Sequence, residues 1–144
     1  MKRVLVISHL PLSSTTNVGK TLLNLFDGYD SNDVSNLFFK IDGYQQNSFN
    51  SYLITDKEVF NATFHMNKNV GTVNPVVADE MTKDDNGTHL NKRSPLSLLI
   101  RDFIWGMGKW KNNKLIEWLE DAKPEVVFLA PGYSMFAYRV ALYI

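Results

Sequence analysis

Two uninterrupted apolar runs constrain the fold of this chain more than any other feature. They are RVLVIS (3–8) and EVVFLAP (125–131), both rich in β-branched residues. Such runs lack the alternation of a half-exposed strand and are typical of strands buried on both faces of a parallel sheet. They predict an α/β domain, provided that the segments between them supply helices.

The segment after the first run alternates between helix and strand. Apolar residues at i, i+4, i+7 and i+8 predict a helix over 18–27, and strands are expected at 35–41 and 51–55. Thr55 and Glu58 have the spacing of a capping box, which marks the start of another helix. The order predicts a Rossmann-like open, mostly parallel sheet flanked by helices.

The second half begins with a polar stretch. Residues 61–94 show little periodicity and are expected to form a long mobile loop. Two helices are predicted within 95–122, separated by a break at Gly106 and Gly108. A last helix follows the turn after the second run, with Ser134 as its N-cap. We expect 1–144 to form one domain that is truncated before its own sheet is complete.

The first of the paired helices carries apolar residues on two sides. Its main stripe consists of Leu96, Leu99, Ile100, Phe103, Ile104 and Met107. At 100° per residue, Leu98 and Trp105 lie opposite this stripe, together with Arg101 and Asp102. We expect one side to face the sheet. The other side would face a neighbouring helix, a missing domain or a membrane surface along 95–118.

Charge and composition exclude several classes of protein. Fifteen basic residues balance fifteen acidic ones, so the chain lacks the basic excess of a nucleic-acid binder. There is no cysteine, and His65 and His89 have no paired ligand spacing, so no metal site is expected. Met-Lys-Arg precedes too short an apolar run for a signal peptide. We therefore predict a cytoplasmic protein, with contact at the inner face of the membrane as an alternative.

Gly19, Lys20 and Thr21 match the end of a P-loop and lie between a predicted strand and helix. The first glycine of that motif is replaced by Ser14, and the only acid that ends a predicted strand is Asp42. Nucleotide hydrolysis is therefore disfavoured. Two interpretations stay open: an anion site at the helix N-terminus, or a plain helix capped by Asn17.

Three segments in order resemble the N-terminal half of bacterial GT-B glycosyltransferases of surface polysaccharide biosynthesis. The segments are ISHLPLSSTTNVGKTLLNLF (7–26), NLFFKIDGYQQNSFNSYLITDKEVF (36–60) and LIRDFIWGMGKWKNNKLIEWLEDAKPEVVFLAPGYSMFAYRVAL (99–142). The resemblance implies a transferase that moves a sugar from a nucleotide-sugar to a glycan or lipid-linked acceptor. It also implies a missing C-terminal domain that binds the donor.

The resemblance also assigns site residues. The loop after the first strand would reach the donor diphosphate through Asn17, Gly19, Lys20 and Thr21. The turn after the strand at 125–131 would line the same acceptor cleft through Gly132, Tyr133 and Ser134. The catalytic residues stay unknown, and His9 is the one candidate for an acid or base. Its alternative is a loop histidine that is hydrogen-bonded to the backbone.

Two rival functions remain beside the transferase. One is a P-loop-like nucleotide-binding protein, which predicts tight, magnesium-dependent binding of ATP or GTP. The other is a non-catalytic subunit of a split transferase that docks on a membrane or a partner. It predicts vesicle binding that weakens when Trp105 or Arg101 is replaced.

Overall fold

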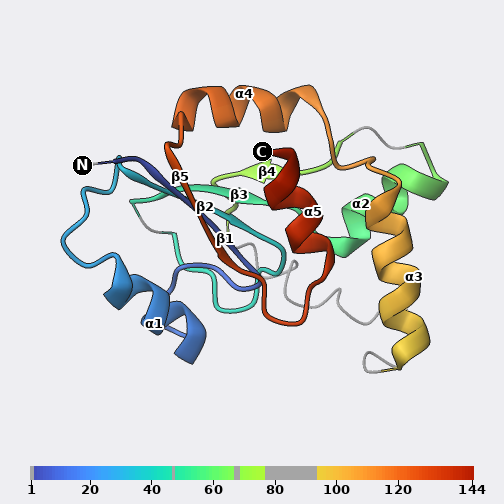
Figure 1. Ribbon diagram of the computed structural model, residues 1–144, viewed down its shortest axis with the longest axis horizontal. Coiled ribbons are helices and arrows are strands. Elements are labelled where there is room, and N and C mark those ends of the chain that lie inside the picture. The colour runs from blue at the N-terminus through green and yellow to red at the C-terminus, as the bar shows by residue number, and fades with distance from the viewer. Residues whose placement is uncertain (1, 47, 67–68, 77–93) are drawn as a thin grey trace.

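The computed structural model describes residues 2–46, 48–66, 69–76 and 94–144. It contains one five-stranded sheet flanked by helices (Figure 1). The elements in chain order are β1 (Val4–Ser8), α1 (Asn17–Leu25), β2 (Val34–Phe38), β3 (Asn50–Leu53), α2 (Asp56–Phe64), β4 (Thr72–Val73), α3 (Pro95–Gly106), α4 (Asn113–Ala122), β5 (Val126–Ala130) and α5 (Phe136–Tyr143). The predicted α/β class with an open, mostly parallel sheet is confirmed.

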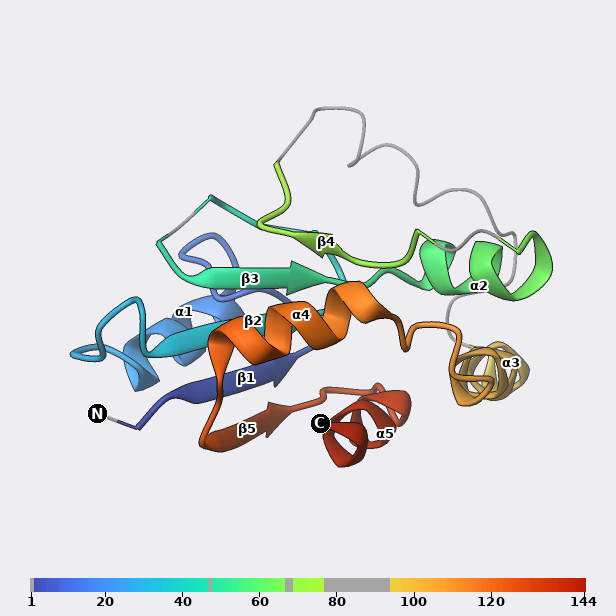
Figure 2. The ribbon, with the colours of Figure 1, turned by 90° about the horizontal axis from the view of Figure 1, so that it is seen from above.

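The strand order places a topological switch beside β1. The order is β4-β3-β2-β1-β5, and only the β3–β4 pair is antiparallel. From β1 the chain moves to β2 on one side, and it later returns to add β5 on the other side. The strands fan out in this order in Figure 2, with α2 and α3 beyond their carboxyl ends. Sheets of this type bind ligands at the carboxyl edge, at the switch point.

The residues of β1 alternate between two hydrophobic cores. Leu5 and Ile7 belong to the larger core, on the face covered by α4 and α5. Val4 and Val6 belong to a smaller core with Leu22 of α1. All four β1 side chains are buried, which explains the uninterrupted apolar run.

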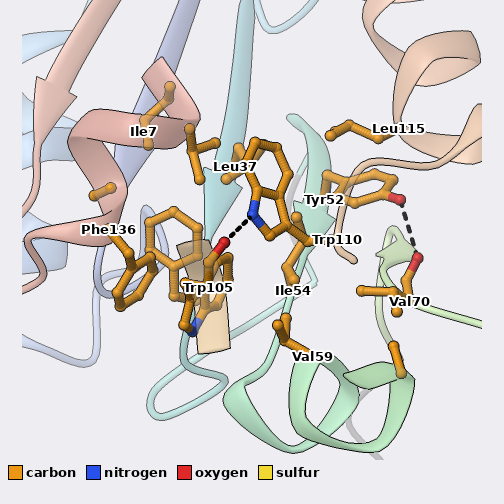
Figure 3. Close-up of a cluster of buried hydrophobic side chains, with 14 of the residues drawn as sticks. Ile7, Leu37, Tyr52, Ile54, Val59, Val70, Trp105, Trp110, Leu115 and Phe136 are labelled. Atoms are coloured by element: carbon orange, nitrogen blue, oxygen red, sulfur yellow. Dashed lines mark hydrogen bonds between the residues drawn. The ribbon is translucent and has the colours of Figure 1, made fainter. Parts of the chain in front are cut away.

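Aromatic residues fill the larger core (Figure 3). The ring of Trp105 stacks on that of Phe136 with centroids 3.9 Å apart, which joins α3 to α5. Trp110 donates from Nε1 to the backbone oxygen of Trp105 at 2.9 Å, and Tyr52 is hydrogen-bonded to Val70 O. Buried aromatic side chains with a satisfied polar atom provide a large share of the apolar area of a small core.

Helix α2 starts as the sequence predicts, and it also fixes α3. The capping box between Thr55 and Glu58 is formed. Asp56, the first residue of α2, accepts hydrogen bonds from Trp105 Nε1 at 2.7 Å and from Arg101 Nε at 3.0 Å. These two directional bonds turn the Trp105 side of α3 toward the body of the protein.

The main apolar stripe of α3 therefore points away from the body of the protein, and the side that packs inward is the one that carries Trp105. Ile104, at its edge, is buried, but Leu99 and Phe103 expose 67% and 70% of their surface. Trp105 exposes only 2% and cannot contact a membrane. The two sides of α3 are both apolar, so the polar contacts of Asp56 decide which side packs inward.

Strand β5 is formed where predicted, but it is not a buried central strand. It is the last strand in the sheet order, and Val126 and Val127 expose 41% and 40% of their surface. Its register with β1 runs from Val4 opposite Val126 to Ser8 opposite Ala130. The apolar run therefore indicated the strand correctly but not its position in the sheet.

Three local expectations differ from the structure. Helix α2 continues to Phe64 and β4 forms at Thr72–Val73, both inside the stretch expected to be a loop. Residues 67–68 and 77–93 of that stretch lie outside the described residues. Ser134 is not an N-cap, because α5 starts after Met135 without a side-chain cap. None of the described helices is both long enough and apolar enough to cross a bilayer.

Candidate functional site

The loop after β1 is held by a polar side chain inside the sheet. Asn36 lies in the middle of β2 and is buried. Its Oδ1 accepts from Leu12 N at 2.9 Å, and its Nδ2 donates to Val6 O at 3.1 Å and to Ser8 Oγ at 3.0 Å. These three bonds satisfy the amide of Asn36 in the core and fix where the chain leaves β1.

The same loop is tied to the loop that follows β2. The hydroxyls of Ser13 and Thr15 both donate to the backbone oxygen of Gly43. Gly43 has φ +72°, and a Cβ at this position would lie 2.4 Å from the methyl group of Thr16. Only glycine allows this close approach without strain. The two loops therefore form one connected surface at the carboxyl edge.

The N-terminus of α1 is capped by Thr16, not by Asn17. The hydroxyl oxygen of Thr16 accepts from Gly19 N at 3.0 Å. Thr21 Oγ1 donates back to Asn17 O at 3.0 Å, and Lys20 is exposed. One donor of the helix N-terminus is thus already used inside the protein, and the role of these residues at a diphosphate stays a prediction.

Gly19 has a packing role of its own. A Cβ at this position would lie 2.5 Å from Ser13 O and 2.9 Å from Pro11 O. The loop folds back over the first turn of α1, and any side chain at position 19 would collide with its carbonyl groups. The glycine is therefore explained by intramolecular packing, whether or not an anion also binds nearby.

A second pair of residues meets directly at the switch point. His9 follows β1 and Ser134 follows β5, and His9 Nδ1 lies 3.0 Å from Ser134 Oγ. A Cβ at Gly132 would be 3.6 Å from His9 Cβ, so this glycine also lies against the histidine. Ser134 is buried and His9 is half-buried. Adjacent strand ends thus bring together residues that are 125 positions apart in sequence.

Charged residues surround the pair and act on the histidine. Burial lowers the pKa of His9 below its ordinary value of 6.5, and the positive charge of Arg101 lowers it further. Asp56 acts in the opposite direction but with a smaller effect on the pKa. Arg101 is also in cation–π contact with the ring of Phe136, with its guanidinium carbon 4.6 Å from the ring centroid. The imidazole of His9 is therefore neutral at neutral pH.

A neutral imidazole held on one nitrogen can exchange a proton through the other. If Nδ1 donates to Ser134, Nε2 of His9 accepts a proton from a bound hydroxyl group. If Ser134 donates instead, Nε2 is a donor. The positive charge of Arg101, which acts on His9, favours an anionic ligand group. The arrangement can therefore bind a polar ligand and move a proton.

The structure brings together some of the residues predicted from sequence and separates others. His9, Gly132 and Ser134 form one cluster, but the side chain of Tyr133 is 97% exposed and points into solvent. Asn17 and Lys20 lie in the first turn of α1. That all of them line one cleft stays a prediction.

Sequence reasoning missed two functional features. The first is Asn36, whose signal is an amide inside an apolar strand segment. The second is the ion pair of Arg101 and Asp56, with Nε and Oδ1 3.0 Å apart. No sequence signal connects these two residues, because they belong to different helices.

Two further features bear on the choice of site. In the part of the chain that the structure describes, no group of three His, Asp or Glu side chains could hold a metal ion. A concavity of about 480 Å³ lies near the amino ends of the strands, where Arg3, Ser35 and Asn50 contribute to its lining. His9, whose pKa is lowered, lies with Ser134 at the opposite, carboxyl edge of the sheet. We place the candidate site at that edge.

Comparison with known proteins gives no match: no family model, no curated protein and no solved structure is significantly similar to this chain.

Proposed function

We propose that this chain is the N-terminal, acceptor-side domain of a GT-B glycosyltransferase of bacterial polysaccharide biosynthesis. The whole enzyme would transfer a sugar from a nucleotide-sugar to a hydroxyl group of a glycan or lipid-linked acceptor. The observation that carries the proposal is the pair of His9 and Ser134 at the β1–β5 switch point. The resemblance of three ordered segments to such enzymes supports it.

The chemistry of the pair fits an acceptor site. The acceptor hydroxyl must lose a proton when the glycosidic bond forms, and a neutral histidine can accept this proton. The lowered pKa of His9 keeps the imidazole neutral. Arg101 would bind an acidic group of the acceptor, such as the phosphate of a lipid carrier, and thereby position the hydroxyl.

The donor diphosphate would approach from the side of α1. Asn17, Lys20 and Thr21 are exposed in the first turn of this helix, and its N-terminus carries partial positive charge. Charge that develops on the departing diphosphate would be stabilised there. The nucleotide itself would be bound by a second domain, so we expect no sugar transfer by these 144 residues alone.

A P-loop nucleotidase is less well supported. Its phosphate loop needs free backbone N–H groups around the ligand, whereas the N–H of Gly19 is bound to Thr16 and the glycine is covered by its own loop. A non-catalytic subunit that docks on a membrane would expose the same surface as the proposed transferase domain. It would differ only in that His9 takes part in no reaction.

The test is an NMR titration of the 144-residue chain with three probes. The first is N-acetylglucosamine linked to a short alkyl diphosphate, as an acceptor analogue; the others are UDP-glucose and magnesium ATP. We expect the acceptor analogue to shift the His9 ring and the Gly132 and Ser134 amides. These shifts should disappear in His9→Ala, while His65→Ala, at an exposed histidine beyond α2, serves as the matched control.

Two results would contradict the proposal. If magnesium ATP binds more tightly than the acceptor analogue and shifts Gly19 and Lys20, the P-loop alternative is correct. If all three probes leave His9 unchanged, this pair does not form an acceptor site.

A further inference from the structure

The concavity at the amino ends of the strands, which we call the amino-edge cavity, is built by several elements at once. Its lining includes Arg3 before β1, Ser35 of β2, Asn50 at the start of β3, Asn74 after β4 and Asp121 of α4. Its volume of about 480 Å³ is in the range of sites that bind small ligands. The cavity therefore belongs to the rigid part of the fold, at the edge opposite the His9 site.

The side-chain amide of Asn50 has one fixed orientation. Trp118 donates from Nε1 to Asn50 Oδ1 at 2.7 Å. Because an indole N–H can only donate, the amide oxygen must face Trp118, and the NH₂ group must lie on the other side of the amide. No described residue accepts a hydrogen bond from Asn50 Nδ2. This NH₂ group is therefore available to donate to a ligand.

The side-chain amide of Asn74 is fixed in the same way. The backbone N–H of Ser51 donates to Asn74 Oδ1 at 2.9 Å, and Asn74 N donates to Ser51 O at 2.7 Å. The side-chain oxygen thus takes the place of a backbone carbonyl next to the β3–β4 pair. A backbone N–H also only donates, so the NH₂ group of Asn74 is the part left over, and no described residue accepts from it.

The rest of the lining adds groups that accept as well as donate. Ser35 exposes only 6% of its surface, and its hydroxyl makes no hydrogen bond with a described residue. Among these residues no fully buried side-chain polar atom lacks a partner, so Ser35 Oγ must reach the cavity surface. Arg3 and Asp121 are the charged residues of the lining and have opposite signs, so the lining has no net charge.

We propose that the amino-edge cavity binds a neutral sugar unit. Each hydroxyl group of a sugar both donates and accepts, so one ligand can accept from the amides of Asn50 and Asn74 and donate to the carboxylate of Asp121. A small anion could use only the donors and would be repelled by Asp121. Both amides are oriented before the ligand arrives, which lowers the entropic cost of binding.

This site is separate from the proposed acceptor site. It lies at the other end of the strands from His9 and Ser134, and it needs no sugar transfer in order to bind. It can therefore exist whether or not the proposed function is correct.

The test is an NMR titration of the 144-residue chain with methyl β-glucoside, methyl β-galactoside and methyl α-mannoside, each up to tens of millimolar. We expect at least one of these glycosides to shift the side-chain NH₂ signals of Asn50 and Asn74. Sodium acetate serves as the comparison, because it is a small anion that only accepts hydrogen bonds.

The double variant Asn50→Asp, Asn74→Asp removes both NH₂ donors and keeps the acceptors of Trp118 Nε1 and Ser51 N. We expect it to bind the glycoside more than about tenfold more weakly, because two hydrogen bonds are lost. The Trp118 Nε1–H signal should remain that of a hydrogen-bonded indole, which checks that the fold is kept. Asp121→Asn, at an exposed position, is a second variant that should weaken binding severalfold without a risk to folding.

The matched control is the pair Asn61→Asp and Asn113→Asp, which adds the same charge outside the cavity lining. It should bind the glycoside like the unchanged chain. The proposal is overturned if no glycoside shifts the two amides, if the control weakens binding as much as the double variant, or if acetate shifts the amides at lower concentration than any glycoside. Glycoside shifts confined to His9 and Ser134 would also overturn it, although they would agree with the proposed acceptor site.

Discussion

Replacing Asn36 by alanine should destabilise the whole sheet and loosen the loop that carries His9. The Asn36 amide makes three hydrogen bonds, one to the N–H of Leu12 and two to groups of β1. Alanine removes all three and leaves the N–H of Leu12, which is fully buried, without this acceptor.

The expected cost follows from these contacts. Each hydrogen bond contributes about 1 kcal/mol net, so three bonds amount to about 3 kcal/mol. Because the effects share one side chain and the loop can relax, we expect a total of about 2–4 kcal/mol. That is a large fraction of the stability of a domain, which is typically about 5–15 kcal/mol.

The assay is urea unfolding followed by tryptophan fluorescence, with the free energy of unfolding obtained by linear extrapolation. Asn32→Ala is the matched control, because Asn32 is exposed and its side chain donates to Asp30 Oδ1 at 3.0 Å. We expect the control to change stability by less than about 0.5 kcal/mol. A cost below about 1 kcal/mol for Asn36→Ala would show that the amide does not hold the loop.

Three other predictions concern the site and its supports. Gly19→Ala should destabilise the chain by about 1–3 kcal/mol in urea unfolding, despite the better helix propensity of alanine; unchanged stability would refute the collision with the loop. Because the pKa of His9 is lowered in the folded state, stability should rise with pH up to about 6.5, and His9→Gln should remove this slope. Asp56→Ala should cost about 2 kcal/mol by the same assay, and Asp56→Asn less, because it keeps an acceptor for Trp105; equal costs would contradict the reasoning.

Features encoded by neighbouring residues could be predicted from the sequence. The run at 3–8 forms β1 because its residues are apolar on both faces, and both faces are indeed covered. Thr55 and Glu58 form a capping box because both partners lie within one turn. The second of the paired helices also forms where it was predicted, with Leu115 and Trp118 buried.

Features that depend on contacts between distant residues could not be predicted from the sequence. Leu99 and Trp105 lie on opposite sides of α3 and both are apolar, so periodicity alone does not say which packs inward. The choice depends on Asp56, which is 49 residues away from Trp105. Likewise, His9 and Ser134 could each be named as candidates, but their contact depends on the pairing of β1 with β5. The whole-enzyme activity stays a proposal.

The exposed strand β5 has a consequence for how this chain behaves at high concentration. Val126–Ala130 contains no charge, proline or glycine, and no strand pairs with its outer side in the part of the chain that the structure describes. Natural sheets usually protect such an edge with lysine, proline or a bulge. Without cover, an apolar β-branched edge is a template for strand addition and self-aggregation. A segment or partner that covers β5 therefore also protects the chain from aggregation. Mutations that uncover β5 would make the protein insoluble before they reduced any activity.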